Sequence, residues 1–294
     1  MTEPDRYMPG VPCWIDSTQP DPDAAATFYG GLFGWELEET MPAGSPGQYL
    51  MARLNGGDVA AISSPSEGAP PAATWNTYVQ VDSADATAAK VREAGGTVLA
   101  EPFDISDSGR MAVFADPQGA QFSVWQPNQF AGASVVNEAG SLNFNDLHTR
   151  DPEGAKAFYG AVFGWETIEM GGGYAMWVLA GYGDLLERRT PGNREGMASM
   201  GAPERFEDVV ASLSPIEDDT PSHWGLTFAV DDADATAKRA QELGGQVVVP
   251  PVDAPWVRMT IITDPQGATF TASKFVPENK DMAAEPADAA VRGS

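Results

Sequence analysis

Apolar and polar residues alternate in short runs along the chain, and these runs enclose longer segments with helical periodicity. The first part of the chain is predicted to contain strands over 12–18, 47–54 and 57–63, with a helix over 21–33. It continues with a strand at 76–81, a helix at 83–96 and strands near 97–100, 110–115 and 120–126. Pro22 lies near the start of the first helix and Gly34 just beyond its end, where each residue is favoured. The pattern is therefore β-α-β-β-β, twice over, and indicates an α+β fold.

The same pattern returns in the second part of the chain. FYGGLFGWE (28–36) is answered by FYGAVFGWE (158–166), and ADPQGAQF (115–122) by TDPQGATF (263–270). The repeat predicts strands at 142–148, near 174–186, at 225–230 and on to about 275, with helices at 151–163 and 232–244. The chain thus consists of two copies of one domain.

We place the copies at residues 1–130 and 142–276, with a linker over 131–141. The offset between matching residues grows from 130 to 149, so the second copy holds about 19 extra residues, and we place this insertion in 183–223. A short amphipathic helix is predicted at Glu204–Leu213, as a flap over a pocket or as surface decoration. The acidic tail, 277–294, is rich in Ala, Pro, Glu and Asp and is predicted to be disordered.

The repeated nonamer is predicted to pack rather than to bind. On a helix, Phe28, Tyr29, Leu32 and Phe33 form one apolar stripe, which would lie against a sheet. The nonamer also serves as a fixed point from which other positions can be counted.

Paired βαβββ modules with FYxxLFGWE, VDxADAT, a GG pair and a terminal DPxGxxF resemble the vicinal oxygen chelate superfamily. This superfamily contains glyoxalases, bleomycin-resistance proteins and extradiol dioxygenases, and the chain is most similar to its two-domain actinobacterial glyoxalase-like members. The resemblance covers about 260 residues. It implies four βαβββ modules that form two glyoxalase-like domains, each an open, U-shaped barrel around a pocket.

The resemblance also locates the positions from which metal-dependent members take their ligands. In this sequence they fall on Trp14, Asn76 and Ser123 in the first copy, and on Phe144, Gly225 and Thr271 in the second. None of these side chains offers the imidazole or carboxylate that a divalent ion prefers. We therefore expect no metal ion and no other cofactor.

Strand alternation predicts which polar residues share the pocket face with those positions. Asp16 and Asp146 follow Trp14 and Phe144 by two residues, and Arg110 and Arg258 each precede DPQG by six. In one interpretation Arg orients a carbonyl, phenolate or carboxylate while Asp accepts a proton. In the other, Asp and Arg only neutralise each other in the barrel.

The two histidines, His148 and His223, both lie in the second copy. They are either surface or hydrogen-bonded residues, or members of a site with Asp146. We assign candidate catalytic roles to Asp16, Arg110, Asp146, His148 and Arg258. Candidate ligand-binding residues are Trp14, Asn76, Tyr78, Ser123, Trp125, Phe144, Trp177, His223, Trp224, Thr227, Trp256 and Thr271. The aromatic members either pack in the core or line a pocket for a planar molecule.

The composition of the chain limits the classes of molecule that it can bind and the compartment in which we expect it. The formal net charge is −25, with 42 acidic against 17 basic residues, which disfavours nucleic acid and is typical of a well-solvated surface. There is no apolar run of membrane-spanning length and no signal-peptide pattern, so we expect a cytoplasmic protein. Cys13, the single cysteine, excludes an internal disulfide and is expected to point away from the pocket.

Two functions from different classes fit these features. The first is a metal-independent enzyme of lyase, isomerase or cyclase type that transfers protons on a small apolar, aromatic or carbonyl-bearing molecule. The second is a protein that binds and sequesters such a molecule without turnover. Since four modules can complete two pockets within one chain, a monomer or weak homodimer is expected.

Overall fold

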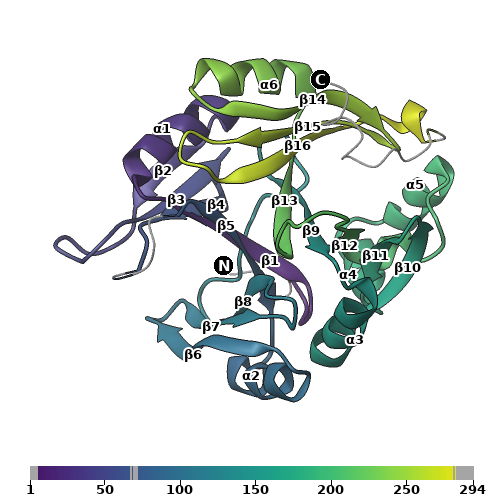
Figure 1. Ribbon diagram of the computed structural model, residues 1–294, viewed down its shortest axis with the longest axis horizontal. Helices are drawn as coiled ribbons and strands as arrows, with labels where there is room; N and C mark the ends of the chain where they lie inside the picture. The colour runs from purple at the N-terminus through teal and green to yellow at the C-terminus, as the bar shows by residue number, and fades with distance from the viewer. Residues whose placement is uncertain (1–5, 67, 69–71, 281, 283–294) are drawn as a thin grey trace. The chain divides into compact units, whose positions relative to one another are not determined.

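A computed structural model describes residues 6–66, 68, 72–280 and 282 of the chain. The first copy forms an open eight-stranded mixed sheet in the order β2-β3-β4-β1-β5-β8-β7-β6 (Figure 1). Its strands are β1 (Pro12–Thr18), β2 (Glu36–Glu39), β3 (Tyr49–Leu54), β4 (Gly57–Ser63), β5 (Thr74–Gln80), β6 (Thr97–Ile105), β7 (Gly109–Ala115) and β8 (Gln121–Pro127). Its helices are α1 (Pro22–Phe33) and α2 (Ala84–Glu93).

The second copy repeats this arrangement in the order β10-β11-β12-β9-β13-β16-β15-β14. Its strands are β9 (Leu142–Thr149), β10 (Glu166–Gly171), β11 (Tyr174–Val178), β12 (Val209–Pro215), β13 (His223–Ala229), β14 (Gln246–Ala254), β15 (Val257–Thr263) and β16 (Thr269–Phe275). Its main helices are α3 (Pro152–Phe163) and α6 (Ala233–Glu242). The α+β fold with four βαβββ modules is confirmed, and neither sheet closes into a barrel.

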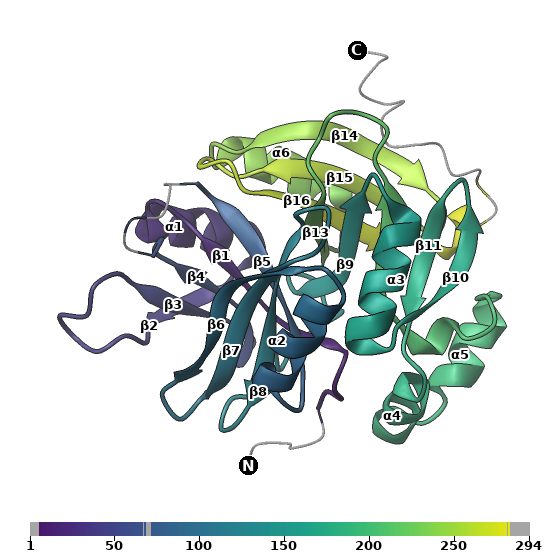
Figure 2. The ribbon, with the colours of Figure 1, turned by 60° about the horizontal axis from the view of Figure 1, so that its bottom comes forward.

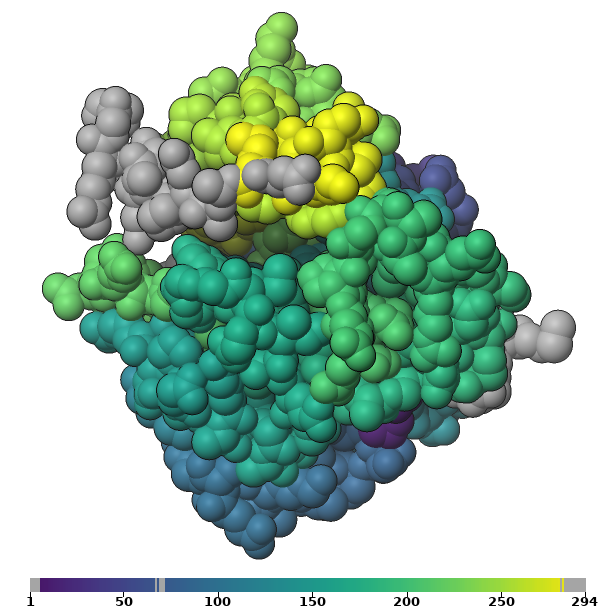
Figure 3. Space-filling view, turned by 90° about the vertical axis from the view of Figure 1, so that its right-hand side faces the viewer, coloured from purple at the N-terminus to yellow at the C-terminus, as the bar shows by residue number. Residues whose placement is uncertain are grey.

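The insertion of the second copy lies near the start of the range predicted for it, 183–223. It forms α4 (Tyr182–Arg189), α5 (Asn193–Met200) and the 3-10 helix η1 (Phe206–Asp208), between β11 and β12. The strand expected near 174–186 therefore ends at Val178. The helix expected at Glu204–Leu213 is wrong, because most of that range belongs to η1 and β12. None of the residues of α5 is buried, so this helix lies at the surface (Figure 3).

The two compact units of the structure do not coincide with the two copies of the repeat. Among the described residues, one unit consists of 6–14, 76–132 and 144–224, and the other of 15–75, 133–143 and 225–282. Each unit therefore combines one module of the first copy with one module of the second. The boundaries at 1–130 and 142–276 therefore mark the repeat in the sequence and not the compact units of the structure.

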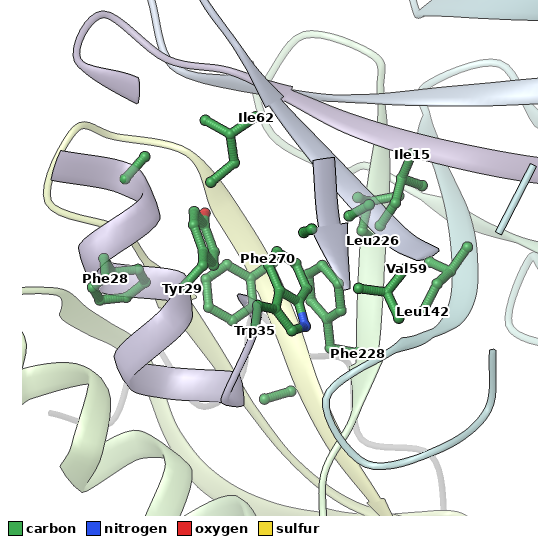
Figure 4. Close-up of a cluster of buried hydrophobic side chains, with 14 of the residues drawn as sticks. Ile15, Phe28, Tyr29, Trp35, Val59, Ile62, Leu142, Leu226, Phe228 and Phe270 are labelled. Atoms are coloured by element: carbon green, nitrogen blue, oxygen red, sulfur yellow. The ribbon is translucent and has the colours of Figure 1, made fainter. Parts of the chain in front are cut away.

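The repeated nonamer belongs to the core, as predicted. Asp21 caps α1 by accepting a hydrogen bond from Ala24 N at 3.0 Å, and Gly34 ends the helix with φ 75°. Phe28 and Tyr29 of α1 are buried in a cluster that also holds Phe228 and Phe270 of the second copy (Figure 4). These aromatic side chains pack between the modules of one compact unit, so they are not available to a ligand.

Hydrogen bonds between the repeated motifs connect the copies within each unit. The Tyr29 hydroxyl donates to Asp264 Oδ2 at 2.8 Å, and the Tyr159 hydroxyl donates to Asp116 Oδ2 at 3.1 Å. In both cases the tyrosine belongs to the FY motif of one copy and the aspartate to the DPQG motif of the other. The two motifs therefore recur together because they form one contact.

The C-terminal end of the described chain follows β16. Pro277–Asn279 form a 3-10 helix, η2, and most of the predicted disordered tail, 277–294, lies outside the described residues. No helix in the described part of the chain has both the length and the apolar character required to cross a membrane.

Candidate functional site

Polar side chains gather on one face of two neighbouring strands in the second sheet. In β9, Asn145, Leu147 and Thr149 are buried, whereas Phe144, Asp146 and His148 between them are partly exposed. Strand β12 runs parallel to β9, with Ser212 paired to Asp146 and Ser214 to His148. Since side chains alternate along a strand, these residues share the face of the sheet turned away from its buried side. We call Phe144, Asp146, His148, Ser212, Ser214 and His223 the open face (β9 and β13 are labelled in Figure 2, and β12 in Figure 1).

The carboxylate of Asp146 lies at the centre of this face. Ser212 Oγ donates to Oδ1 at 2.6 Å, Ser214 Oγ lies 3.1 Å from Oδ1 and 3.0 Å from Oδ2, and His148 Nε2 is 2.9 Å from Oδ2. Partial burial would raise the pKa of Asp146, but His148 and the two serine hydroxyls outweigh it and hold that pKa below its usual value. Asp146 is therefore a fixed anion at neutral pH.

His223 stacks on His148. The ring centroids are 4.7 Å apart and the planes differ by 9°. Nδ1 of His223 lies 2.9 Å from the carbonyl oxygen of Pro221. Partial burial and the neighbouring His148 lower the pKa of His223, against smaller opposing effects of Pro221 and Asp146. Both histidines of the chain thus lie beside the same carboxylate.

The corresponding face of the first sheet has a different set of residues. Asp16 occupies the position of Asp146, but Thr18 stands where His148 stands and Ala61 where Ser212 stands, as the pairing of β1 with β4 shows. The hydroxyl of Tyr49 lies 3.4 Å from Asp16 Oδ2. The acid–imidazole arrangement is therefore confined to the second copy.

The first sheet is also closed to solvent where the second is open. Six of the seven residues of β1 are buried on both faces of the strand, including Trp14 and Asp16, which are 3% and 4% exposed. The side chains of Asp146 and His148 are 21% and 34% exposed. Accessibility thus separates the two copies as clearly as their chemistry does.

Phe130 explains part of this closure. It follows β8 and contacts Trp14 and Trp125 edge-on, with ring centroids 4.8 and 6.1 Å away. Trp125 Nε1 also donates to the carbonyl oxygen of Phe130 at 2.8 Å. Trp14 and Trp125, predicted to line a pocket, pack instead on a residue of their own chain.

Other predicted ligand-binding residues share the faces expected from their spacing. Tyr78 pairs with Ser123 across β5 and β8, and both are buried. Thr227 pairs with Thr271 across β13 and β16, and both are partly exposed. Asn76, in β5, is partly buried. Tyr78 and Ser123 of the first copy are thus covered, whereas Asn76 is partly exposed like Thr227 and Thr271 of the second copy.

The predicted pairing of Arg110 and Arg258 with the pocket aspartates is wrong. Arg110 forms a two-pronged ion pair with Asp85 of α2 at 2.8 and 3.0 Å, and also contacts Asp104. Arg258 pairs in the same way with Asp234 of α6 and with Asp253. Each arginine thus attaches a helix to its own sheet. The spacing in the sequence correctly predicts that each arginine lies in a strand, but it does not predict which carboxylate the arginine pairs with.

Three tryptophans predicted to line a pocket contact other side chains of the protein instead. Trp177 is fully buried, and Trp224, also buried, donates from Nε1 to the Tyr159 hydroxyl at 2.9 Å. Both contact Tyr159 and Trp165, so they belong to the core. Trp256 follows Pro255 in the turn between β14 and β15, with φ 69°, and stacks on Phe275 at 6.2 Å.

Sequence reasoning missed Ser212 and Ser214. The signal was present in VVASLSP (209–215), where small polar residues alternate with buried apolar ones. The segment falls within the predicted insertion, 183–223, and no strand of the repeat is expected over it. Pro221 and Phe130 were missed as well, since a carbonyl contact and a packing contact leave no pattern in a sequence.

The donor set does not fit a divalent ion of the kind that the fold family uses. Trp14 and Phe144 hold aromatic rings at the first ligand position, and Ser123 and Thr271 hold hydroxyls at the last. Parallel stacking keeps the nitrogen lone pairs of His148 and His223 in separate planes, so both cannot point at one ion. Among the described residues, no group of three or more His, Cys, Asp or Glu side chains is arranged to hold a metal.

Comparison with known proteins assigns the family. A family model described as the Glyoxalase/Bleomycin resistance protein/Dioxygenase superfamily matches residues 14–124 and again 141–271. The chain belongs to this superfamily. The two matched ranges correspond to the two copies, and each includes the Asp of its first strand.

Curated relatives of this superfamily member extend over nearly the whole chain. The protein named "Putative glyoxylase CFP32" of Mycobacterium bovis is 40% identical over 283 residues, which are 95% of this chain and 100% of the relative. The "Anthracycline biosynthesis protein DnrV" of Streptomyces peucetius is 35% identical over 281 residues, 90% of this chain and 94% of that one.

Solved structures agree at the level of the fold. A Mn(II)-bound glyoxalase from Novosphingobium aromaticivorans has a TM-score of 0.59 at 16% identity, covering 90% of this chain and 82% of that one. The 2,3-dioxygenase LapB from Pseudomonas sp. KL28 has a TM-score of 0.57 at 12% identity, covering 91% and 93%. At these identities the likeness concerns architecture alone.

Proposed function

We propose that the open face of the second sheet binds a small carbonyl-bearing organic molecule and transfers a proton on it without a metal ion. The reaction would be of lyase, isomerase or cyclase type. The observation that carries this proposal is the Asp146–His148–His223 cluster, placed on an accessible face where the first copy has a closed one.

Two features support a role in chemistry rather than in folding alone. Ionisable groups whose pKa is shifted by specific neighbours are concentrated at functional sites, and Asp146, partly exposed and hydrogen-bonded by Ser212 and Ser214, is such a group. Imidazole is also the side chain whose ordinary pKa suits proton transfer near neutral pH. An aspartate held ionised next to such a group fixes its orientation, as in many acid–base sites.

The ligand class follows from the neighbours of the cluster and from one relative. Phe144 lies two residues from Asp146 on the same face and offers an apolar surface for a ring to contact. A relative is named for the biosynthesis of anthracyclines, and we take an organic molecule of this kind as the model for the ligand. We therefore expect a planar or aromatic carbonyl compound.

The experiment is to identify the ligand and then to compare matched substitutions. Mass spectrometry of small molecules released from the purified protein supplies candidates, and a thermal-shift screen of aromatic ketones supplements them. Asp146→Asn should weaken binding or abolish turnover, whereas Asp16→Asn in the closed first face should change neither. Equal effects of the two substitutions would contradict the proposal.

Sequestration without turnover is the competing outcome. Tight binding that survives Asp146→Asn, together with no conversion of any bound compound by the parent protein, would favour a binding protein over an enzyme.

A further inference from the structure

His223 has a defined tautomer. The carbonyl oxygen of Pro221 can only accept a hydrogen bond, so Nδ1 of His223, 2.9 Å away, must carry the proton. In the neutral ring this leaves Nε2 with its lone pair. His223 is the first residue of β13 and is exposed to solvent. A basic nitrogen is therefore presented at the surface of the open face.

The other two members of the cluster are less exposed than His223. The carboxylate of Asp146, 21% exposed, already accepts hydrogen bonds from Ser212 and Ser214 and lies against His148 Nε2. Because a carboxylate can only accept here, His148 Nε2 carries a hydrogen that points at Asp146, and only Nδ1 of this side chain, which is 34% exposed, is left to accept a proton. The stack with His148 in turn fixes the plane of the His223 ring.

We propose that Nε2 of His223 is the proton acceptor of this site, acting on a carbonyl compound with an acidic C–H next to the carbonyl group. The inference rests on the proposed function and names its base and its substrate class. Asp146 is then a positioning residue that acts through His148. His148 positions the base by stacking.

The substrate class follows from the strength of the base. A neutral imidazole removes protons only from carbon or oxygen acids that are already activated, since its efficiency depends on the match of the two pKa values. Burial and the neighbouring His148 weaken His223 further as a base. A C–H bond next to a ketone is activated in this way, whereas an isolated C–H bond is not.

The step balances without an added reagent. The C–H bond breaks, its proton passes to Nε2 of His223, and its electron pair moves into the C–C bond as the carbonyl becomes an enolate. The enolate is reprotonated at carbon by the imidazolium, at the same position or at a conjugated one. In deuterated water the same cycle exchanges the hydrogen of the substrate for deuterium.

The first test reads the tautomers directly. The chain contains two histidines, so long-range ¹H–¹⁵N NMR spectra show two imidazole systems, which His148→Gln and His223→Gln assign. At pH 7.5 we expect His223 as the neutral Nδ1–H form. A neutral Nε2–H form, or a ring still protonated at that pH, would overturn the inference.

The second test uses the planar ketone 2-tetralone and follows deuterium exchange at its activated carbon by ¹H NMR. In the parent protein the exchange should exceed the buffer rate, and His223→Gln should lower it about 100-fold or more. Chemical-shift changes of 2-tetralone should persist in His223→Gln, because the base is not needed for binding. Lys90→Gln, at an exposed position of α2, serves as the folded control.

The outcomes separate the two proposals. Exchange that stays within about threefold of the parent in His223→Gln but is lost in Asp146→Asn would overturn His223 as the base and leave the proposed function standing. Binding of 2-tetralone by the parent without exchange above buffer would overturn the base and favour sequestration. No binding by the parent, together with the wrong tautomer, would overturn both.

Discussion

Tyr159 of the second copy donates a hydrogen bond of 3.1 Å to Asp116 of the first, and the pair lies in one compact unit. Its counterpart, Tyr29 with Asp264, lies in the other unit. The aromatic nonamer that the sequence repeats is therefore one half of a contact between copies. In each DPQG motif the aspartate Oδ1 accepts backbone N–H groups of its own turn, whereas Oδ2 accepts the tyrosine hydroxyl of the other copy.

Loss of the Tyr159 hydroxyl is predicted to destabilise the fold. Tyr159→Phe leaves the buried Asp116 carboxylate without one donor, and we expect the free energy of unfolding to fall by about 1–3 kcal/mol. Urea denaturation followed by tryptophan fluorescence measures this. Tyr29→Phe is the matched variant and should cost a similar amount, and a change below about 0.5 kcal/mol in both would contradict the role assigned to the contact.

Phe130 is predicted to be needed for the closed first face. Phe130→Ala removes the ring between Trp14 and Trp125, and we expect a loss of about 3–5 kcal/mol in the free energy of unfolding. Quenching of tryptophan fluorescence by acrylamide should rise in the folded variant, because indoles that were covered become accessible. Phe130→Leu, which retains most of the volume, should lose less stability, and equal losses would argue against packing as the cause.

Stability is predicted to fall in mild acid because of His223. Its pKa is lowered in the folded state, so below the unfolded imidazole value of about 6.5 the unfolded chain binds more protons than the folded one. The midpoint of urea unfolding should therefore decrease as the pH falls from about 7.5 to 5.5. His223→Gln should flatten this dependence. Asp146 does not contribute to the change in stability over this pH range, since its pKa lies below the usual carboxyl value.

Metal removal is predicted to have no effect. The family's ligand positions hold side chains such as Trp14 and Thr271, which are not divalent-ion ligands. Dialysis against EDTA should leave the melting temperature and the affinity for an aromatic ketone unchanged. Elemental analysis that finds one equivalent of zinc, nickel, manganese or iron, lost together with binding, would contradict this expectation.

Arg110 is predicted to be dispensable for ligand binding. It pairs with Asp85 and Asp104, both well exposed, so Arg110→Gln should cost less than about 1 kcal/mol in stability. The affinity for a ligand at the second sheet should not change. Arg258→Gln is the matched variant in the second copy. A large loss of affinity in Arg258→Gln would restore this arginine to the site.

Counting along the sequence located the strands of the site with good accuracy. Asp146 and His148 lie on one face of β9, as their spacing predicts, because the period of a strand is fixed at two. The same rule placed Thr227 and Thr271 together. The same rule did not predict the ion pair of Arg110 with Asp85, since alternation determines which residues share a face of a strand but not which helix or strand covers that face.

The sequence by itself determined the repeat, the four modules and the order of their elements, because hydrophobic periodicity and helix-terminal residues act locally. Only the tertiary structure decided which copy is accessible. Phe130 contacting Trp14, and His223 stacking on His148, are contacts between residues more than 70 positions apart, and no local pattern encodes them. The candidate site is thus a property of packing: the equivalent strands that contain CWID and NFND differ in accessibility, because the first is covered and the second is not.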